Sequence, residues 1–392
     1  MALPAAMAVN MTQLRQRPNK PLQLDTGLPL EQLPTPALVI NKPALQRNIA
    51  TMASYLGQHG KGFRPHAKTH KCPLIAALQL QAGAEGICVA KVSEAVVMVE
   101  AGIEPLLITS PITTAAKAEV VGALAQRTTQ LQIVVDSLAG LAALEAALPT
   151  DAQLGILIDL DINMGRTGVR DDGLVLSLLE RLAANPQLNF VGFQHYAGHV
   201  MHVQGYSERR DKSLALWAQV EERLASLAAA GVTPKVVTGC GTGTYNIDVE
   251  VDAVTDLQVG SYIFMDEEYR LIGGIGQERF EDFEVSLTVA CTTISAPTAK
   301  TITVDGGYKA LASDTVAPVC DDLPGVKFRF AGDEHGVLIK PEGEQSLQLG
   351  QLVQVVTPHC DPTVNLHDYY WMQEEDGLVH SAWPISARGC SW

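Results

Sequence analysis

Residues 131–159 read LQIVVDSLAGLAALEAALPTDAQLGILID, and this stretch sets the pattern that the first two-thirds of the chain follows. Its two ends, Leu131–Asp136 and Leu154–Asp159, are short apolar, β-branched runs that predict buried strands. Between them, Leu138–Leu148 has the apolar spacing of a helix. A strand, a helix and a second strand in succession predict a parallel βαβ unit.

The same alternation extends in both directions from this stretch. The further strands predicted are Gly62–Pro65, Gly86–Ala90, Leu106–Thr109, Asn189–His195, Lys235–Thr238 and Thr255–Val259. The further helices predicted are Leu74–Ala82, Ser93–Ala101, Ala115–Ala125, Gly173–Ala184 and Glu208–Ala229. Eight parallel strands that alternate with helices close into a barrel, so the predicted fold of residues 35–275 is a (β/α)8 TIM barrel of the α/β class.

After residue 275 the pattern changes to strands that no long helix separates. Turn signals stand at residues 305–307 and 341–343. Residues 276–392 are therefore predicted to form a mainly β C-terminal domain, and residues 1–34 an N-terminal extension that partly packs on it. The strands predicted in this part are Val285–Thr293, Lys300–Val304, Gly336–Ile339 and Leu352–Val356.

The composition narrows the classes of function. A chain of 392 residues exceeds the size at which one core stops growing, which predicts two domains. The net charge of −15 argues against nucleic acid or an anionic membrane as a partner. Seven scattered cysteines indicate free thiols in a reducing compartment. We expect a cytoplasmic protein, although the acid-free first 24 residues, with Arg15, Arg17 and Lys20, leave an organellar transit peptide open.

Polar residues and glycines are concentrated where the predicted strands end. In a barrel enzyme the catalytic residues come from the carboxyl ends of the strands, which all meet at one rim. The clusters follow the first, fifth, sixth, seventh and eighth strands, and they comprise residues 64–71, 159–166, 195–202, 238–245 and 260–262. The sequence therefore predicts an active site at this rim.

The glycine cluster Gly239–Thr244 leaves a predicted strand and enters a short helix. Glycines allow backbone N–H groups to converge on an anion, and the helix N-terminus adds partial positive charge. A flexible turn would explain such a pattern equally well when it stands alone. Its place after the seventh strand favours a phosphate site, because barrels commonly bind phosphate after strands seven and eight.

Lys68 ends the first predicted strand among His66, His70 and Lys71. Cationic neighbours and partial burial depress the pKa of a lysine, which an amine that attacks a carbonyl requires. On its own, this segment fits a solvated basic turn better. Together with a phosphate site on the same rim, it indicates a phosphorylated aldehyde cofactor, and pyridoxal phosphate combines both features.

His359 and Asp361 stand at positions i and i+2, so an extended backbone would point both side chains to one face and Cys360 away from it. An imidazole with a carboxylate suits Mn²⁺ or Mg²⁺ better than a thiolate site does. A core histidine beside a turn aspartate explains such a pair better when nothing else supports a metal.

Five segments, taken together, resemble one enzyme family. They are Thr35–Ile40, Arg64–Lys71, Thr238–Thr244, Gly260–Asp266 and Pro358–Asn365. They are similar to the D-threonine aldolase and D-serine dehydratase family of fold-type III pyridoxal-phosphate enzymes, which are related to alanine racemase. The resemblance implies a cofactor-binding barrel, a β domain that the strand near Ala37–Ile40 joins, and a homodimer with active sites at the subunit interface.

The resemblance also implies cofactor-binding roles, residue by residue. Lys68 resembles the Schiff-base lysine. Arg166 resembles the arginine at the phenolic oxygen of the cofactor, and Tyr196 resembles the tyrosine near the pyridine ring. The residues that resemble the phosphate site are Gly239, Gly241, Thr242, Gly243 and Thr244, with Ser261 and Tyr262 as weaker candidates.

His359 and Asp361 resemble the metal ligands of the aldolase branch, with Mn²⁺ favoured and Mg²⁺ or another divalent ion open. His202 resembles the general base of the aldolases, and the resemblance places His199 beside the substrate hydroxyl as well. Dehydratase-like members tend to carry His-x-Cys, where a thiolate suits Zn²⁺. The carboxylate of Asp361 favours the aldolase branch, although a shift by one residue would offer Cys360 instead.

The expected function is therefore retro-aldol cleavage of a small D-3-hydroxy amino acid, such as D-threonine, to glycine and an aldehyde. The alternatives are a D-serine dehydratase, an aldolase or dehydratase of 3-hydroxy-D-aspartate, a non-catalytic pyridoxal-phosphate-binding protein, and a barrel that binds sugar phosphates without this cofactor.

Overall fold

The computed structural model describes residues 20–312, 316–341 and 347–392. Contacts divide the chain into two compact units. Among the described residues, one unit comprises 52–68, 75–260 and 390–392, and the other comprises 20–51, 69–74, 261–312, 316–341 and 347–389. Residues 1–19, which are most of the predicted N-terminal extension and of the possible transit peptide, lie outside the described residues. The predicted domain boundaries stay a prediction.

Eight parallel strands form the sheet of the first unit, in the order β3-β10-β9-β8-β7-β6-β5-β4. Every predicted barrel strand is present, with ends within two residues of the predicted ones. Their bounds are β3 (Gly62–Phe63), β4 (Ile87–Val89), β5 (Leu106–Ile108), β6 (Leu131–Val135), β7 (Leu154–Leu160), β8 (Leu188–His195), β9 (Val236–Gly239) and β10 (Asp256–Leu257).

The sheet closes between its first two strands in chain order. The amide of Cys88 donates to the carbonyl of Pro65 at 2.8 Å, and the amide of Ala67 donates to the carbonyl of Cys88 at 2.7 Å. A parallel bridge joins His66 to Cys88 as well. We call residues 65–67 with Cys88 the closing seam. The seam joins the two end strands of the described sheet, β3 and β4, and it confirms the predicted barrel.

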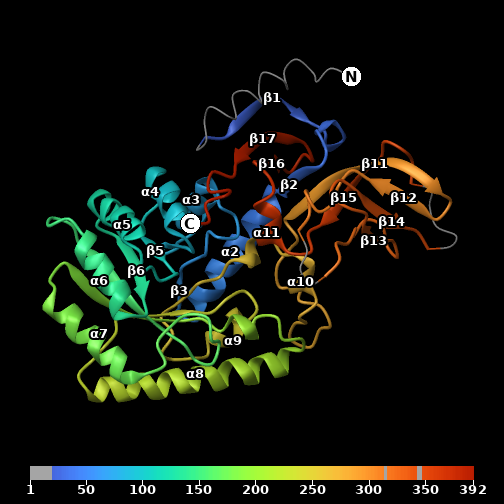
Figure 1. Ribbon diagram of the computed structural model, residues 1–392. Helices are drawn as coiled ribbons and strands as arrows, with labels where there is room; N and C mark the ends of the chain where they lie inside the picture. The colour runs from blue at the N-terminus through green and yellow to red at the C-terminus, as the bar shows by residue number, and fades with distance from the viewer. Residues whose placement is uncertain (1–19, 313–315, 342–346) are drawn as a thin grey trace. The chain divides into compact units, whose positions relative to one another are not determined.

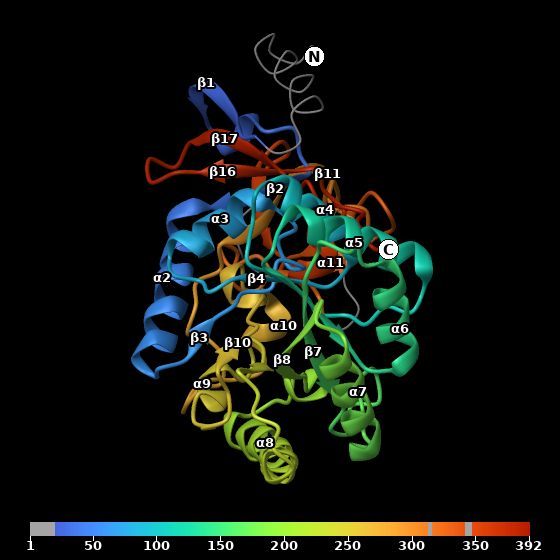
Figure 2. The same ribbon diagram turned by 90° about the vertical axis from the view of Figure 1, so that its left-hand side faces the viewer.

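Helices surround this sheet, and Figure 2 shows several of them outside strands β4, β7, β8 and β10. Each turns an apolar face inward, as α7 does with Val175, Leu178 and Leu182. The hydroxyl of Ser137 caps α6, and the carboxylate of Asp171 caps α7. The helices of this unit are α4 (Val92–Glu100), α5 (Ala115–Arg127), α6 (Leu138–Ala147), α7 (Asp172–Ala184), η2 (Gly198–Val200), α8 (Tyr206–Ala229) and α9 (Tyr245–Asp248).

Two further helices, α2 (Lys42–Gln58) and α3 (Pro73–Gln81), contain residues of both units. Helix α2 is longer than any predicted helix except that over 208–229, yet it was missing from the predicted helices.

Within the described residues, no helix is long and apolar enough to cross a membrane. All seven cysteines are free, as predicted, and six of them are buried.

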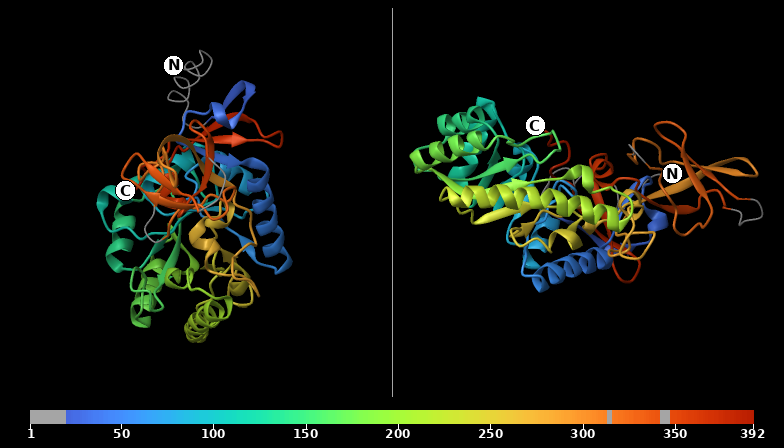
Figure 3. Two further views of the ribbon diagram at one scale, coloured as in Figure 1. Left: turned by 90° about the vertical axis from the view of Figure 1, so that its right-hand side faces the viewer. Right: turned by 90° about the horizontal axis from the view of Figure 1, so that it is seen from below.

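The second unit is built on an antiparallel-rich sheet in the order β1-β17-β16-β2-β11-β12-β14-β13, with β15 paired to β11. Strand β2 pairs with β11 and with β16, which confirms that the strand near Ala37–Ile40 joins the β structure. Figure 1 shows these strands in blue, orange and red, and Figure 3 repeats them from two further sides.

The strands of this sheet are β1 (Leu22–Leu28), β2 (Ala37–Asn41), β11 (Leu287–Thr298), β12 (Thr301–Val304), β13 (Lys327–Phe330), β14 (Gly336–Ile339), β15 (Leu352–Val356), β16 (Tyr369–Gln373) and β17 (Val379–Pro384). Its short helices are η1 (Leu30–Gln32), η3 (Ser261–Ile263), α10 (Glu267–Arg270) and α11 (Cys360–Val364). Four strands, β1, β13, β16 and β17, were missing from the predicted set.

Replacing a core leucine tests the packing of the barrel. Leu157 is fully buried against Leu107 and Val134. We expect Leu157→Ala to lower the free energy of unfolding in urea by about 3 kcal/mol, because it removes apolar contacts and leaves a cavity. Leu176→Ala, at a half-exposed leucine of α7, should change it by less than about 0.5 kcal/mol. Equal effects of the two substitutions would contradict this packing.

Candidate active site

The predicted site residues follow the division of the chain into two units. Lys68, Arg166, Tyr196, His199 and His202 belong to the barrel unit, as does the Gly239–Thr244 loop, and all of them follow the carboxyl ends of strands. The residues in the other unit are Ser261, Tyr262, His359 and Asp361.

Lys68 is the first residue after the closing seam. Its amide donates to Nδ1 of His66 at 3.3 Å, and Nε2 of His66 lies 3.0 Å from the hydroxyl of Thr109. That hydroxyl donates in turn to the carbonyl of Val89 at 3.1 Å. The backbone of Lys68 is therefore fixed by a chain of hydrogen bonds that reaches strands β4 and β5.

These hydrogen bonds define the charge of two neighbouring histidines. Nδ1 of His66 accepts an amide proton, and Nδ1 of His70 accepts the amide proton of Cys72 at 3.1 Å. An imidazolium has no acceptor, so both rings are neutral. The prediction that His66 and His70 act as cationic neighbours of Lys68 is therefore wrong, because buried backbone amides occupy the nitrogens that would take up the second proton.

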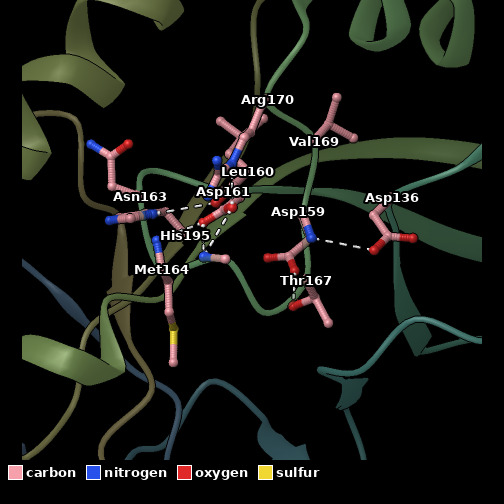
Figure 4. Close-up of polar contacts among 12 residues, drawn as sticks. Asp136, Asp159, Leu160, Asp161, Asn163, Met164, Thr167, Val169, Arg170 and His195 are labelled. Carbon is pink, nitrogen blue, oxygen red and sulfur yellow. Dashed lines mark hydrogen bonds and ion pairs between the residues drawn. The ribbon is translucent and has the colours of Figure 1, made fainter.

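Arg166 lies in a loop that Asp161 organises, shown in Figure 4. The Asp161 carboxylate accepts the amides of Met164 at 2.8 Å and Gly165 at 3.1 Å, and Nε of Arg170 at 2.6 Å. Burial acts to raise the pKa of Asp161, but these hydrogen bonds outweigh it and lower the pKa. A charged carboxylate thus holds the turn that carries Arg166.

The backbone of the same loop is tightly constrained. Asn163 has a φ of 65°, and Gly168 has a φ of 103°. A Cβ on Gly168 would lie 2.6 Å from the amide nitrogen of Asp161, so no other residue fits there. The loop presents the exposed Arg166 side chain with its Cζ atom 5.0 Å from the ring centroid of Tyr196. The structure therefore brings these two predicted cofactor residues together.

Below the loop, the buried carboxylate of Asp159 accepts hydrogen bonds from Thr167 at 2.8 Å and from Gln194 at 3.0 Å. Burial raises the pKa of Asp159 to about 6 in spite of these hydrogen bonds. Asp159 therefore links the Arg166 loop to strand β8 and changes its charge near neutral pH. Sequence reasoning did not assign it a role, because a strand-end aspartate gives no sign of its hydrogen-bond partners.

His195 ends strand β8, directly before Tyr196. It is 2% exposed, its Nδ1 lies 3.3 Å from the carbonyl of Leu160, and its ring meets the edge of Trp217. Burial lowers the pKa of His195 to about 4, so the ring is neutral at pH 7. His199 and His202, which follow it, are exposed.

The Gly239–Thr244 loop fits an anion. It connects strand β9 to helix α9, as predicted, and every residue in it is buried. The amide of Thr244 donates to the carbonyl of Gly241, whereas the amides of Gly241 and Gly243 have no acceptor among the described residues. Buried N–H groups without an acceptor are costly, so these two mark the place for a ligand such as a phosphate.

The glycines of this loop are required by close packing. A Cβ on Gly243 would lie 2.2 Å from the carbonyl oxygen of Met201, and one on Gly241 would lie 2.6 Å from the Met201 sulfur. The contact at Gly243 is with a backbone carbonyl and excludes any side chain, whereas the contact at Gly241 is with a flexible side chain that would have to move. The loop after β9 therefore touches the backbone of the loop after β8 at Gly243. Ser261 and Tyr262 are buried in η3, and their share in the phosphate site stays a prediction.

His359 and Asp361 do not lie in an extended segment. Residues 360–364 form the short helix α11, and His359 is its N-cap residue. The hydroxyl of Thr363 donates to the carbonyl of His359 at 2.8 Å, and Asp266 accepts the amide of Cys360 at 2.8 Å. The predicted i, i+2 geometry is therefore wrong, because the first turn of a helix with a carboxylate at its start replaces the extended backbone.

Cys360 and Asp361 differ in exposure. The side chain of Cys360 is fully buried, and burial raises the pKa of the thiol, which the carboxylates of Asp266 and Asp361 raise further. Asp361 is only half-buried, so its carboxylate is the more accessible of the two groups to an ion from solvent.

A further residue that the sequence analysis missed lies beside His359. Oε2 of Glu268, in helix α10, is 3.5 Å from Nδ1 of His359. A metal-binding histidine usually donates its second ring N–H to a carboxylate, which leaves the other nitrogen for the metal. Glu268 stands 91 positions before His359, and no local pattern could have connected the two.

These side chains fit one kind of metal site. Within the described residues, no group of three or more His, Cys, Asp and Glu side chains is placed to bind a metal. One imidazole and one carboxylate fit a hard divalent ion such as Mn²⁺ or Mg²⁺, which keeps water molecules in its shell.

Comparisons with known proteins cover nearly the whole chain. The family model described as "Alanine racemase, N-terminal domain" matches residues 40–268, and the one described as "Putative serine dehydratase domain" matches residues 286–373. A D-threonine aldolase of Arthrobacter sp is 37% identical over 93% of this chain and 95% of its own. A 3-hydroxy-D-aspartate aldolase of Paracoccus denitrificans is 34% identical over 93% and 94%.

Solved structures show the same likeness. The crystal structure of D-threonine aldolase from Filomicrobium marinum superposes with a TM-score of 0.88 and 34% identity. The match covers 93% of this chain and 98% of that one. The barrel and the β structure described above are thus found together in this solved structure.

A pH titration of stability tests the buried carboxyl of Asp159. The pKa of about 6 in the folded protein exceeds the ordinary value of 3.8, so the group stabilises the fold at low pH. This stabilisation is lost as the pH rises through 6. Between pH 5 and 8 we expect the free energy of unfolding of Asp159→Asn to rise relative to wild type by about 1 kcal/mol.

The measurement is urea unfolding at several pH values, with Asp211→Asn as the control at an exposed aspartate. Asp211→Asn should follow the wild-type pH dependence. A constant difference between Asp159→Asn and wild type across this range would show that the carboxyl does not titrate there.

Proposed function

Because the chain belongs to the D-threonine aldolase and D-serine dehydratase family, we propose that it is a lyase that cleaves small D-3-hydroxy amino acids to glycine and an aldehyde, with pyridoxal phosphate and a divalent metal. The observation that carries this proposal is the 37% identity to a D-threonine aldolase over 93% of the chain. The D-threonine-like substrate class rests on that relative and on the solved aldolase.

Several features of the barrel support pyridoxal phosphate as the cofactor. When bound, it supplies an aldehyde for the substrate amine and a ring that accepts the electrons of the broken bond. The amine of Lys68 would hold the aldehyde carbon, and the amides of Gly241 and Gly243 would hold the phosphate. The guanidinium of Arg166, which lies against the ring of Tyr196, would supply positive charge to the phenolic oxygen.

The catalytic proton transfer falls to the exposed histidines of the loop after β8. His202 accepts the proton of the substrate β-hydroxyl, directly or through a water molecule, while His199 orients that hydroxyl. Loss of this proton drives cleavage of the Cα–Cβ bond and release of the aldehyde. Protonation at Cα then gives glycine.

His359 and Asp361 would hold the metal, with Mn²⁺ favoured, and a bound divalent ion lowers the pKa of a hydroxyl that it ligates. Glu268 would hold the ring of His359 in the orientation that binds the metal.

We propose that the protein is a homodimer, on the basis of the family resemblance. Cytoplasmic location stays a prediction.

Dehydration is the second candidate function, with D-serine or 3-hydroxy-D-aspartate as substrate. The match of residues 286–373 to a serine dehydratase domain favours it, and the 3-hydroxy-D-aspartate aldolase relative favours that substrate for cleavage as well. The thiolate zinc site of dehydratase-like members would need Cys360, which is fully buried, in place of the half-buried Asp361. A non-catalytic cofactor carrier or a sugar-phosphate barrel would show no turnover of any of these amino acids.

Product analysis tests the proposal. With pyridoxal phosphate, Mn²⁺ and D-threonine, we expect glycine and acetaldehyde in equal amounts, and loss of both when EDTA removes the metal. Ammonia with 2-oxobutyrate would instead show a dehydratase. If D-threonine gives neither pair, 3-hydroxy-D-aspartate is the substrate to assay, with glycine and glyoxylate as the aldolase products. Activity that survives chelation would contradict the proposed dependence on a divalent metal.

Glu268→Gln tests the support of the metal site. The substitution keeps the shape of the side chain but removes the charge next to Nδ1 of His359. We expect the affinity for Mn²⁺, measured by calorimetry, to fall about 10-fold to 100-fold. The control is Glu281→Gln, at an exposed glutamate, which should bind Mn²⁺ as the wild type does. An unchanged Mn²⁺ affinity in Glu268→Gln would show that Glu268 does not support metal binding by His359.

A further inference from the structure

Helix α8 has a buried polar face beneath the anion-binding loop. The helix spans Tyr206–Ala229 and is largely exposed, and the right-hand view of Figure 3 shows it lengthwise in yellow-green. Arg209, Ser213 and Trp217 follow one another at intervals of four residues, so they lie on one face. They are 0%, 2% and 3% exposed. A fully buried arginine at an otherwise solvent-facing helix needs an explanation.

Arg209 holds two loops at once. Its Nε donates to the carbonyl of Gly243 at 2.7 Å, and its Nη1 donates to the carbonyl of Val203 at 2.8 Å. Gly243 belongs to the loop with the two unpaired amides, and Val203 follows the proposed general base His202. One guanidinium thus connects the phosphate side of the site to the proton-transfer side.

Asp248 holds the same loop from its other end. The carboxylate accepts the hydroxyl of Ser213 at 2.6 Å and the hydroxyl of Thr244. The thiol of Cys240 and the indole of Trp217 also hydrogen-bond to it. Cys240 and Thr244 bracket the glycines, and Cys240 adopts a left-handed φ of 69° that is unfavourable for a side chain. The carboxylate fixes both ends of the loop in this unfavourable shape.

These contacts determine which backbone groups stay available. Arg209 occupies the carbonyl of Gly243, and Asp248 occupies the hydroxyl of Thr244. The amides of Gly241 and Gly243 keep no acceptor among the described residues. Because the carbonyl side of the loop is tied down from helix α8, the peptide groups cannot turn to satisfy these amides within the protein.

We propose that Arg209 and Asp248 are positioning residues for the cofactor phosphate, and that they hold the Gly239–Thr244 loop in its anion-binding shape from beneath. This inference rests on the proposed function as far as the cofactor is concerned. Neither side chain is a catalytic residue, because each acts through the loop. The loss of either should therefore weaken binding of a phosphorylated ligand more than binding of the same ligand without phosphate.

The experiment compares pyridoxal phosphate with pyridoxal, which lacks the phosphate. Protein stripped of cofactor is titrated with each, and binding is followed by absorbance. For Arg209→Lys and Asp248→Asn we expect the affinity for pyridoxal phosphate to fall on the order of tenfold. The affinity for pyridoxal should stay within about twofold, since it makes no use of the loop. The first variant keeps the charge but not the two-point hydrogen bonding.

Arg210→Gln is the matched control. Arg210 is the neighbouring arginine on α8, and it pairs with Glu250 at the surface. It should bind both compounds as the wild type does. Urea unfolding of each variant shows whether it is folded, and if Arg209→Lys does not fold, Asp248→Asn and Ser213→Ala provide the comparison.

The outcomes separate this inference from the proposed function. Equal losses for the two compounds, or no loss for either, would overturn the positioning role while the wild type still binds pyridoxal phosphate. A wild-type protein that binds neither compound would overturn the proposed cofactor, and this inference with it. A loss confined to pyridoxal phosphate in the variants supports the role, whichever reaction the protein catalyses.

Discussion

The seam between residues 65–67 and Cys88 is the constraint on which the rest of the barrel depends. An open parallel sheet would leave strand edges exposed, whereas closure brings the carboxyl ends of all eight strands to one rim. Lys68 follows the seam directly. The backbone that carries the proposed cofactor lysine is therefore held by the same hydrogen bonds that close the sheet.

Two loops on this rim are built in the same way. Asp161 gathers the amides of the loop that carries Arg166, and Asp248 gathers hydroxyl, thiol and indole donors around the glycine loop. In each case a carboxylate offsets the cost of a left-handed residue, Asn163 in one loop and Cys240 in the other. The site thus presents positive charge and amides to a ligand, while the carboxylates that hold it face the protein.

The sequence alone predicted the barrel strands closely, because each βαβ unit is a local pattern of apolar spacing. It missed β16 and β17, which pair with each other and with distant strands β2 and β1, since their burial is decided by partners far along the chain. The expectation of an extended backbone at His359 also failed. Asp266, which stands 93 positions before His359, accepts a backbone hydrogen bond at the start of the helix that follows His359, and local spacing could not reveal this contact. The resemblance supplied the candidate site residues, whereas the contacts of Glu268 with His359 and of Arg209 with Gly243 are apparent only in the fold.

The contact between the glycine loop and Met201 limits how this enzyme can diversify. Gly243 lies against the backbone carbonyl of Met201 with no room for a methyl group, and Gly241 lies against its sulfur. The loop after β8 also contains the histidines proposed for proton transfer, so a shift of its backbone would move the proposed cofactor loop as well. Substitution of the Met201 side chain leaves the carbonyl in place, so side-chain exchanges in this loop should be tolerated better than insertions that displace its backbone.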